Sequence, residues 1–198
     1  MYSDDFDLNA LLPDEQEQTI VSKFTKKKED EKPSCYDDEI KPWLWNGEVI
    51  EKIPTEHKSF VYLFTNKITG KQYIGFKTAV SNKTVVVNGK KRKTVTESDW
   101  KTYYSSGQQV LHDIAKYGRG NFIREIMALT VNKSVGKYVE AEYQFGRGAI
   151  IDKTGRYYNG IINLRLNHKL VMDYDKVVRA SKLVGDELRA TIINGDTK

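Results

Sequence analysis

Two short runs of β-branched and aromatic residues, FVYLFTN and KQYIGFKT, constrain the fold of this chain most. Gly70 lies between them and supplies the positive φ of a tight turn, so the pattern predicts a β-hairpin. Because side chains alternate faces along a strand, we expect Tyr62 and Tyr73 on one face of it. Gly75 beside them would let a backbone or a ligand approach closely. Two phenols next to a glycine indicate either a site or an aromatic pair that only stabilises the sheet.

Charge is unevenly distributed along the 198 residues. Residues 1–40 hold 12 acidic and 5 basic side chains, whereas the rest of the chain holds 15 acidic and 27 basic ones. The basic excess of residues 41–198 favours a polyanionic partner, because neutralising phosphates releases counterions. The alternative is that the charge only keeps the protein soluble. A single cysteine, Cys35, allows no intrachain disulfide and predicts a reducing, cytoplasmic compartment.

The same composition predicts how the chain is divided. Residues 1–35 have few apolar side chains and blocks of charge, which predicts a flexible tail, with a short helix around Pro13 to Phe24 as the alternative. We expect a domain over 36–168 and a helical extension over 169–198. No apolar run is long enough to cross a bilayer, and the acidic start is unlike a signal peptide, so no membrane partner is expected.

Periodicity predicts the remaining elements. Trp43 and Trp45, at alternate positions, indicate a lead-in strand anchored through one face. Residues 80–96 predict a second hairpin, because Asn88-Gly89 lies between β-branched runs. Further on, the patterns predict a helix over 110–117 ended by Gly118 and a strand over 122–129, for which a helix is the alternative. They also predict a helix over 137–151, an extended segment over 157–166 and a C-terminal helix over 170–193, either continuous or broken near Gly185. The order predicts an α+β fold with a small antiparallel or mixed sheet flanked by helices.

Several short motifs follow one another over residues 60–163, the predicted core of the domain. They are FVY, QYIG, YYSS, IAKYG, FIREI, YVEAEYQF and YYNG. In this order and spacing the chain resembles the GIY-YIG nuclease family, and within it the phage-encoded seg-like endonucleases of the homing type. The resemblance implies a DNA endonuclease that uses Mg²⁺ or Mn²⁺ and that acts in the cytoplasm of a bacterial host.

The resemblance also assigns roles to particular residues. Tyr62 and Tyr73 match the two tyrosines of the family's name motif, whose implied roles are to position or deprotonate the attacking water and to contact the scissile phosphate. Glu140 is the expected metal ligand, and Glu142 is the alternative, because it fits the broader family pattern almost as well. The two carboxylates lie two residues apart on a helix, so they face different sides. Asn159 matches an asparagine that holds the site by side-chain hydrogen bonds.

Two departures from the family pattern concern positive charge. The first motif reads FVY, which keeps the tyrosine. The second departure is that many members carry a catalytic arginine on a helix soon after the second motif, whereas this chain has the 80–96 insertion at that place. Lys77, which could also favour a charged phenol, or Arg92 is a candidate replacement. Four cations near the tip of the second hairpin, Lys90, Lys91, Arg92 and Lys93, are expected to touch phosphates.

Other observations leave the function partly open. Ser105 and Ser106 either cap a helix or contact phosphate. The three histidines show no metal-ligand spacing and no Gly-rich phosphate loop occurs, so we expect neither a zinc site nor a nucleotide cofactor. A nuclease fold that binds nucleic acid without cutting it, and a protein-interaction module, are the competing functions.

Overall fold

A computed structural model describes residues 32–87, 89–165 and 167–194, without the side chains of Val87 and Asn194. The predicted helix around Pro13 to Phe24 and nearly all of the predicted tail lie outside the described residues. From Ser34 onward, the described residues belong to one compact unit.

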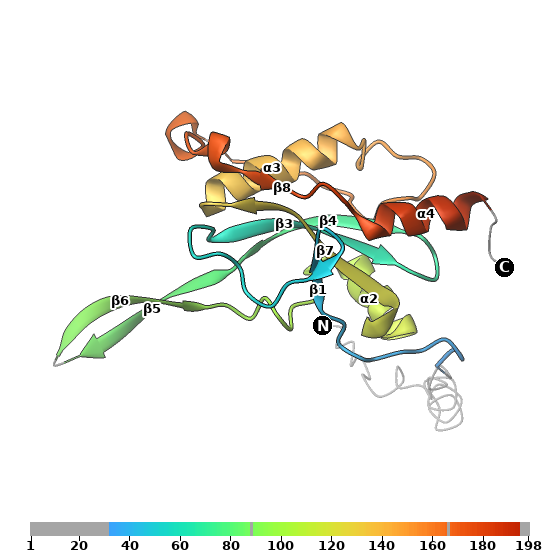
Figure 1. Cartoon of the computed structure of the whole chain (residues 1–198), viewed down its shortest axis with the longest axis horizontal. Coiled ribbons are helices and arrows are strands. Elements are labelled where there is room, and N and C mark those ends of the chain that lie inside the picture. Colours follow the sequence, from blue (N-terminus) through green and yellow to red (C-terminus); the bar gives the residue numbers. More distant parts are fainter. Residues whose placement is uncertain (1–31, 88, 166, 195–198) are drawn as a thin grey trace, which may run out of the picture. The chain divides into compact units, whose positions relative to one another are not determined.

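A mixed sheet organises this unit (Figure 1). Its path runs β2-β1-β7-β3-β4, and β8 pairs with β7. The strands are β1 (Trp43–Trp45), β2 (Glu48–Val49), β3 (Ser59–Asn66), β4 (Gln72–Thr78), β7 (Phe122–Thr130) and β8 (Val178–Arg179). β1 runs parallel to β7, whereas β3 is antiparallel to both β4 and β7. With helices on the sheet, the predicted α+β class is confirmed.

The predicted first hairpin is β3–β4, and Gly70 turns it with φ +67°. Tyr62 pairs with Gly75, and Phe64 pairs with Tyr73, so the two tyrosines are diagonal neighbours on one face. Their ring centroids lie 6.2 Å apart. A Cβ on Gly75 would lie 2.4 Å from the ring of Tyr62. The glycine therefore makes room for that ring, which corrects the expectation that it admits a ligand.

Both faces of β3 are covered, and every residue of this strand is buried. On one face Tyr62 packs in an aromatic cluster with Trp43 and Trp100, and α2 (Gln108–Tyr117) closes it through Val110. Trp45 packs against the same cluster, which confirms the expected shared face of the two β1 tryptophans. On the other face, α3 (Lys133–Gly146) covers the aliphatic side chains of β3 and β4 (Figure 1).

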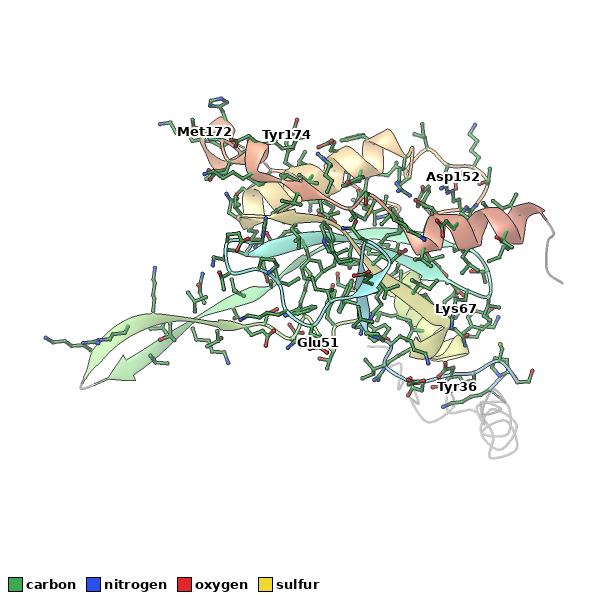
Figure 2. All side chains as sticks on the ribbon, in the orientation of Figure 1. Tyr36, Glu51, Lys67, Asp152, Met172 and Tyr174 are labelled. Carbon is green, nitrogen blue, oxygen red and sulfur yellow. The ribbon has the colours of Figure 1, made fainter. Side chains whose placement is uncertain are left out.

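The second predicted hairpin is also present. It consists of β5 (Val80–Val87) and β6 (Lys90–Glu97), paired in register along their whole length. Gly89 turns it with φ +72°, and Asn88 lies outside the described residues. Figure 1 shows this ribbon running out beyond the other strands, and Figure 2 shows its side chains pointing away from it on both faces. We call β5–β6 the ribbon.

Helix positions differ from the sequence prediction in two places. α2 and its end at Gly118 (φ +87°) are as predicted. α3, however, spans 133–146 rather than 137–151. It begins earlier because the side chain of Asn132 accepts hydrogen bonds from the N–H groups of Ser134 and Val135, at 2.9 and 3.0 Å. Asn132 is itself the sequence signal that marks this earlier start.

The prediction of one helix over 170–193 is wrong for its first half. Residues 168–179 form two 3-10 turns and strand β8, and only α4 (Val184–Asn194) is helical. The buried carboxylate of Glu125 accepts hydrogen bonds from the N–H groups of Val184 and Gly185 and thereby fixes the start of α4. A Cβ on Gly185 would lie 2.1 Å from the Thr65 hydroxyl, so the glycine is needed for this close approach rather than for a break.

Candidate active site

A cleft of about 530 Å³ lies along the outer edge of β4. The start of α2, the middle of α3 and the segment 158–164 form its walls. The polar side chains that line it include Tyr73, Ser106, Lys137, Glu140, Gln144 and Asn159. Three of the five predicted catalytic residues therefore meet here, although they come from three separate parts of the chain. We call this cavity the cleft.

Asn159 ties one wall of the cleft to the sheet. Its side-chain oxygen accepts a hydrogen bond from the N–H of Ile74 at 2.9 Å, and its amide nitrogen donates to the carbonyl of Ile74 at 2.8 Å. One side chain thus occupies the hydrogen-bonding position of a neighbouring strand on the β4 edge. Tyr158 extends the pairing through its N–H to the carbonyl of Gln72, at 2.8 Å. The extended segment expected over 157–166 is regular only in this stretch.

The two tyrosines differ in their access to the cleft. Tyr73 is half-buried and lines the cleft, whereas Tyr62 is 1% exposed and lies behind it. Burial, reinforced by the charge of Glu140, raises the pKa of Tyr73 to about 12. Burial raises the pKa of Tyr62 well above its ordinary value as well, and the phenols of Tyr103 and Tyr73 add to the effect. Both phenols are therefore neutral at pH 7, and only Tyr73 can reach a ligand.

Ser105 and Ser106 precede α2 without capping it. Gly107 is the N-cap of this helix, and no side chain bonds to the first turn. Ser105 is buried with φ +34°, and its hydroxyl accepts a hydrogen bond from the N–H of Gly107 at 3.0 Å. A Cβ on Gly107 would lie 3.2 Å from the Tyr73 ring, so this strained turn packs closely against the tyrosine. Ser106 is exposed and faces the cleft. Helix capping is thus the wrong reading of this pair.

Glu140 is the carboxylate of the cleft. Burial raises the pKa of Glu140 to about 7, although the charge of Lys137 opposes the shift. The amide of Gln144, one turn further along α3, donates to this carboxylate at 3.4 Å and to the carbonyl of Ile74 at 3.3 Å. The oxygen of the same amide is buried and has no hydrogen-bond partner among the described residues. The carboxylate of Glu140 therefore keeps unused acceptor capacity, and the amide that bonds to it carries a further unpaired oxygen.

Glu142 lies on a different face of α3. Its carboxylate accepts two hydrogen bonds from Arg179 at 3.0 Å and one from the hydroxyl of Tyr174 at 2.6 Å. Tyr174, labelled in Figure 2, belongs to the turn that precedes β8. Glu142 thus links α3 to the C-terminal segment, and it does not line the cleft.

The positive charge of the cleft comes from a residue that the sequence prediction did not name. Lys137 lines the cleft and lies three residues before Glu140, on the same face of α3. The ammonium of Lys77 instead contacts Asp99 at 2.6 Å and lies 3.9 Å from the centroid of the Tyr103 ring. Arg92 is on the ribbon. Spacing from Glu140 along one helix face could have identified both Lys137 and Gln144.

The donor set suits a hard divalent cation. Among the residues that the structure describes, no three His, Cys, Asp or Glu side chains gather as a metal cage. Mg²⁺ does not need one, because it keeps several waters and is commonly held by one or two carboxylates together with substrate phosphates. The single carboxylate of Glu140, beside the unpaired oxygen of Gln144, fits such an ion better than it fits zinc.

Fold and cleft together define a small α+β domain in which an edge strand brings a phenol, and helix α3 a carboxylate and an ammonium, to one cavity. A family model for the GIY-YIG domain of endonuclease segE matches residues 43–162 of the chain. The chain therefore belongs to the GIY-YIG nuclease family, and its seg-like type is confirmed. No curated protein and no solved structure gives a significant match. Within the described part of the chain, no helix has the length and apolarity to cross a membrane.

Proposed function

We propose that this protein is a metal-dependent endonuclease that hydrolyses DNA phosphodiester bonds in the cleft. The observation that carries the proposal is the convergence of Tyr73, Lys137 and Glu140 in one cavity of a GIY-YIG domain. The basic body of the chain supports a DNA substrate, because phosphate neutralisation dominates the affinity of such proteins.

Each cleft residue has a distinct role in this proposal. Glu140 holds the Mg²⁺ or Mn²⁺ ion, which supplies positive charge to the phosphate oxygens and to the attacking water. Tyr73 stays protonated, because its pKa is raised to about 12, and it orients the water and the phosphate by hydrogen bonds. Lys137 places a second cation beside the phosphate and thereby supplies, from α3, the positive charge that the family's arginine provides from another position. Tyr62 and Ser105 act behind Tyr73 by fixing its ring.

Phosphate contacts outside the reaction centre come from two places. Ser106 and the first residues of α2 line the cleft, and an anion is favoured at a helix start by the helix dipole. The exposed cations Lys90, Lys91, Arg92 and Lys93 extend the positive surface along the ribbon. The resemblance to seg-like enzymes leads us to propose further that the protein is phage-encoded, acts in the host cytoplasm and has a homing role.

One pair of variants tests the proposal. Glu140→Gln and Glu142→Gln make the same chemical change two residues apart on α3, but only the first alters the cleft. We expect Glu140→Gln to lower the single-turnover rate of Mg²⁺-dependent plasmid cleavage by about 1,000-fold while DNA binding stays intact or tightens. Glu142→Gln should cut within about threefold of the unchanged protein.

Two results would contradict these roles. If Glu142→Gln is inactive and Glu140→Gln cuts normally, the metal ligand is Glu142. If the unchanged protein binds DNA but cuts none with either metal, the competing function of nucleic-acid binding holds. The binding of Mn²⁺ to the protein–DNA complex, measured by electron paramagnetic resonance, separates a lost ion from a lost step of chemistry, because only Glu140→Gln should release the ion.

A further inference from the structure

The ribbon carries no packing that accounts for its presence. Its two strands of eight residues pair with each other, and their side chains are exposed over most of their length, including Val86 (64%) and Val95 (60%). An isolated two-stranded hairpin is at best marginally stable in water. Exposed valines on such a hairpin leave apolar surface in water and bury none of it in a core. This favours a partner that contacts both the valines and the cations.

The charge of the ribbon restricts the partner to a polyanion. Five cations occur between Ser81 and Thr96, and no acidic residue occurs there. Eight residues at about 3.3 Å per residue give a ribbon of roughly 25 Å, the length of about seven base pairs of duplex. The major groove of B-DNA is wide enough to admit a two-stranded β-ribbon. The length and charge of the ribbon therefore match a DNA groove rather than a single phosphate.

Cross-strand pairing assigns each side chain to one of two faces. Directly paired residues share a face, and neighbours along a strand lie on opposite faces. The Arg92 face consists of Ser81, Lys83, Val85, Lys90, Arg92, Thr94 and Thr96, and the Lys93 face consists of Val80, Asn82, Thr84, Val86, Lys91, Lys93, Val95 and Glu97.

The root of the Lys93 face is turned toward another part of the protein. A cavity of about 600 Å³ lies there, lined by Val80, Val95 and Glu97 of this face, by Thr96 of the Arg92 face and by the segment that contains Glu51. Glu51 is labelled beside the root of the ribbon in Figure 2. Side chains at this root therefore face the rest of the protein, which leaves less of the Lys93 face open to a DNA groove.

The Arg92 face has the residue types that read base edges. Arginine and lysine donate hydrogen bonds to guanine, threonine can donate to a base or accept from one, and an aliphatic side chain contacts the thymine methyl group. This face carries three cations and no carboxylate. From these observations we infer that the ribbon enters the major groove of duplex DNA with its Arg92 face toward the bases and selects the sequence at which the enzyme acts. The inference rests on the proposed function for its DNA partner, but not on cleavage.

The reading position lies away from the cut. Val80 follows Tyr73, which lines the cleft, by seven residues of nearly continuous strand, which span roughly 20 Å. The ribbon then adds its own length. Sequence preference should therefore appear at base pairs displaced from the cleavage position by roughly 6 to 13 base pairs, where the cleft itself touches no base.

The test compares two adjacent residues on opposite faces. Arg92→Gln and Lys93→Gln each remove one charge from the same strand, and both side chains are exposed, so the fold should be unaffected. Full-length protein is incubated with a random duplex library in EDTA, and the bound pool is sequenced. We expect the unchanged protein and Lys93→Gln to enrich the same bases, whereas Arg92→Gln loses at least about fivefold preference at one or two positions.

A groove-specific readout accompanies the selection. Dimethyl sulfate methylates guanine N7 in the major groove, and we expect Arg92→Gln alone to lose protection there. Equal pools for the two variants, or a pool altered only in Lys93→Gln, would overturn the inference and leave a phosphate clamp. Because no cleavage is required, an inactive enzyme that still shows the Arg92-dependent pool refutes the proposed function and keeps this inference.

Discussion

The two hairpins of this chain have similar local sequence signals and opposite surroundings. In β3–β4 every residue of the first strand is buried, and the second strand borders the cleft. In β5–β6 the strands lie outside any core, with charged and valine side chains exposed. Turn residues and β-branched runs therefore decide pairing, whereas the polarity of alternate positions decides burial. We infer that the buried hairpin builds the chemistry and that the exposed one holds the DNA.

Glycine substitutions should give the largest contrast between the hairpins. Gly75→Ala places a Cβ 2.4 Å from the Tyr62 ring, whereas a Cβ on Gly89 has nothing within 4 Å. We expect Gly75→Ala to cost about 3 kcal/mol and to lower the melting temperature by roughly 6–12 °C. Gly89→Ala is strained by its positive φ, but the ribbon absorbs that cost locally, so the melting temperature should stay within about 2 °C.

A double variant checks the cause of the Gly75 effect. Tyr62→Ala removes the ring that the new Cβ would meet, so the stability costs of Gly75→Ala and Tyr62→Ala should be clearly less than additive. Additive costs would show that the clash between these residues is not what matters at position 75.

Within the buried hairpin, we expect Tyr73 to act on the substrate and Tyr62 only to stabilise the site behind it. Tyr73→Phe removes the hydroxyl that lines the cleft, and single-turnover cleavage should fall about 100-fold. Tyr62→Phe removes a buried hydroxyl behind it, so cleavage should fall by less than about tenfold, with a loss of stability of about 1 kcal/mol. Equal reductions in rate would show that both phenols act on the substrate.

The exposed hairpin should respond to salt rather than to packing. Replacing Lys90, Lys91, Arg92 and Lys93 with Ala should reduce the slope of log affinity against log salt by roughly one unit for each phosphate that the ribbon no longer neutralises. Lys153→Ala, an exposed change outside the ribbon and the cleft, is the control and should leave the slope within one unit. An unchanged slope in the quadruple variant would mean that these cations are solvated in the complex.

The cleft should also make the enzyme dependent on pH. Burial raises the pKa of Glu140 to about 7, so below that pH the carboxylate is protonated and cannot hold the cation. At limiting Mg²⁺, cleavage should rise about tenfold per pH unit up to pH 7 and then level off. Between pH 4.5, the ordinary pKa of a glutamate, and pH 7, Glu140 is protonated in the native state but not in the unfolded state. The free energy of unfolding should therefore fall as pH rises through that range. Glu140→Gln should abolish this fall in stability.

Much of this arrangement could be predicted from local sequence. The two hairpins, α2, β7 and the sheet class follow from alternation, turn residues and helical spacing. The prediction for the first half of the C-terminal helix is wrong because the structure of that segment depends on tertiary contacts. These are the pairing of β8 with β7 and the capping of α4 by Glu125. The burial of Tyr62 also lay beyond local pattern, since it arises from Trp43 and Trp100 at distant positions.

The division of labour between the hairpins can be measured directly. Val80 and Glu97 are paired, so residues 81–96 can be replaced by an Asn-Gly turn that keeps the root of the ribbon closed. Single-turnover cleavage is then followed over a range of enzyme concentrations. We predict that the saturating rate stays within about threefold of the unchanged protein, while the concentration needed for half saturation rises at least tenfold. A saturating rate that falls as far as that of Tyr73→Phe would contradict the account.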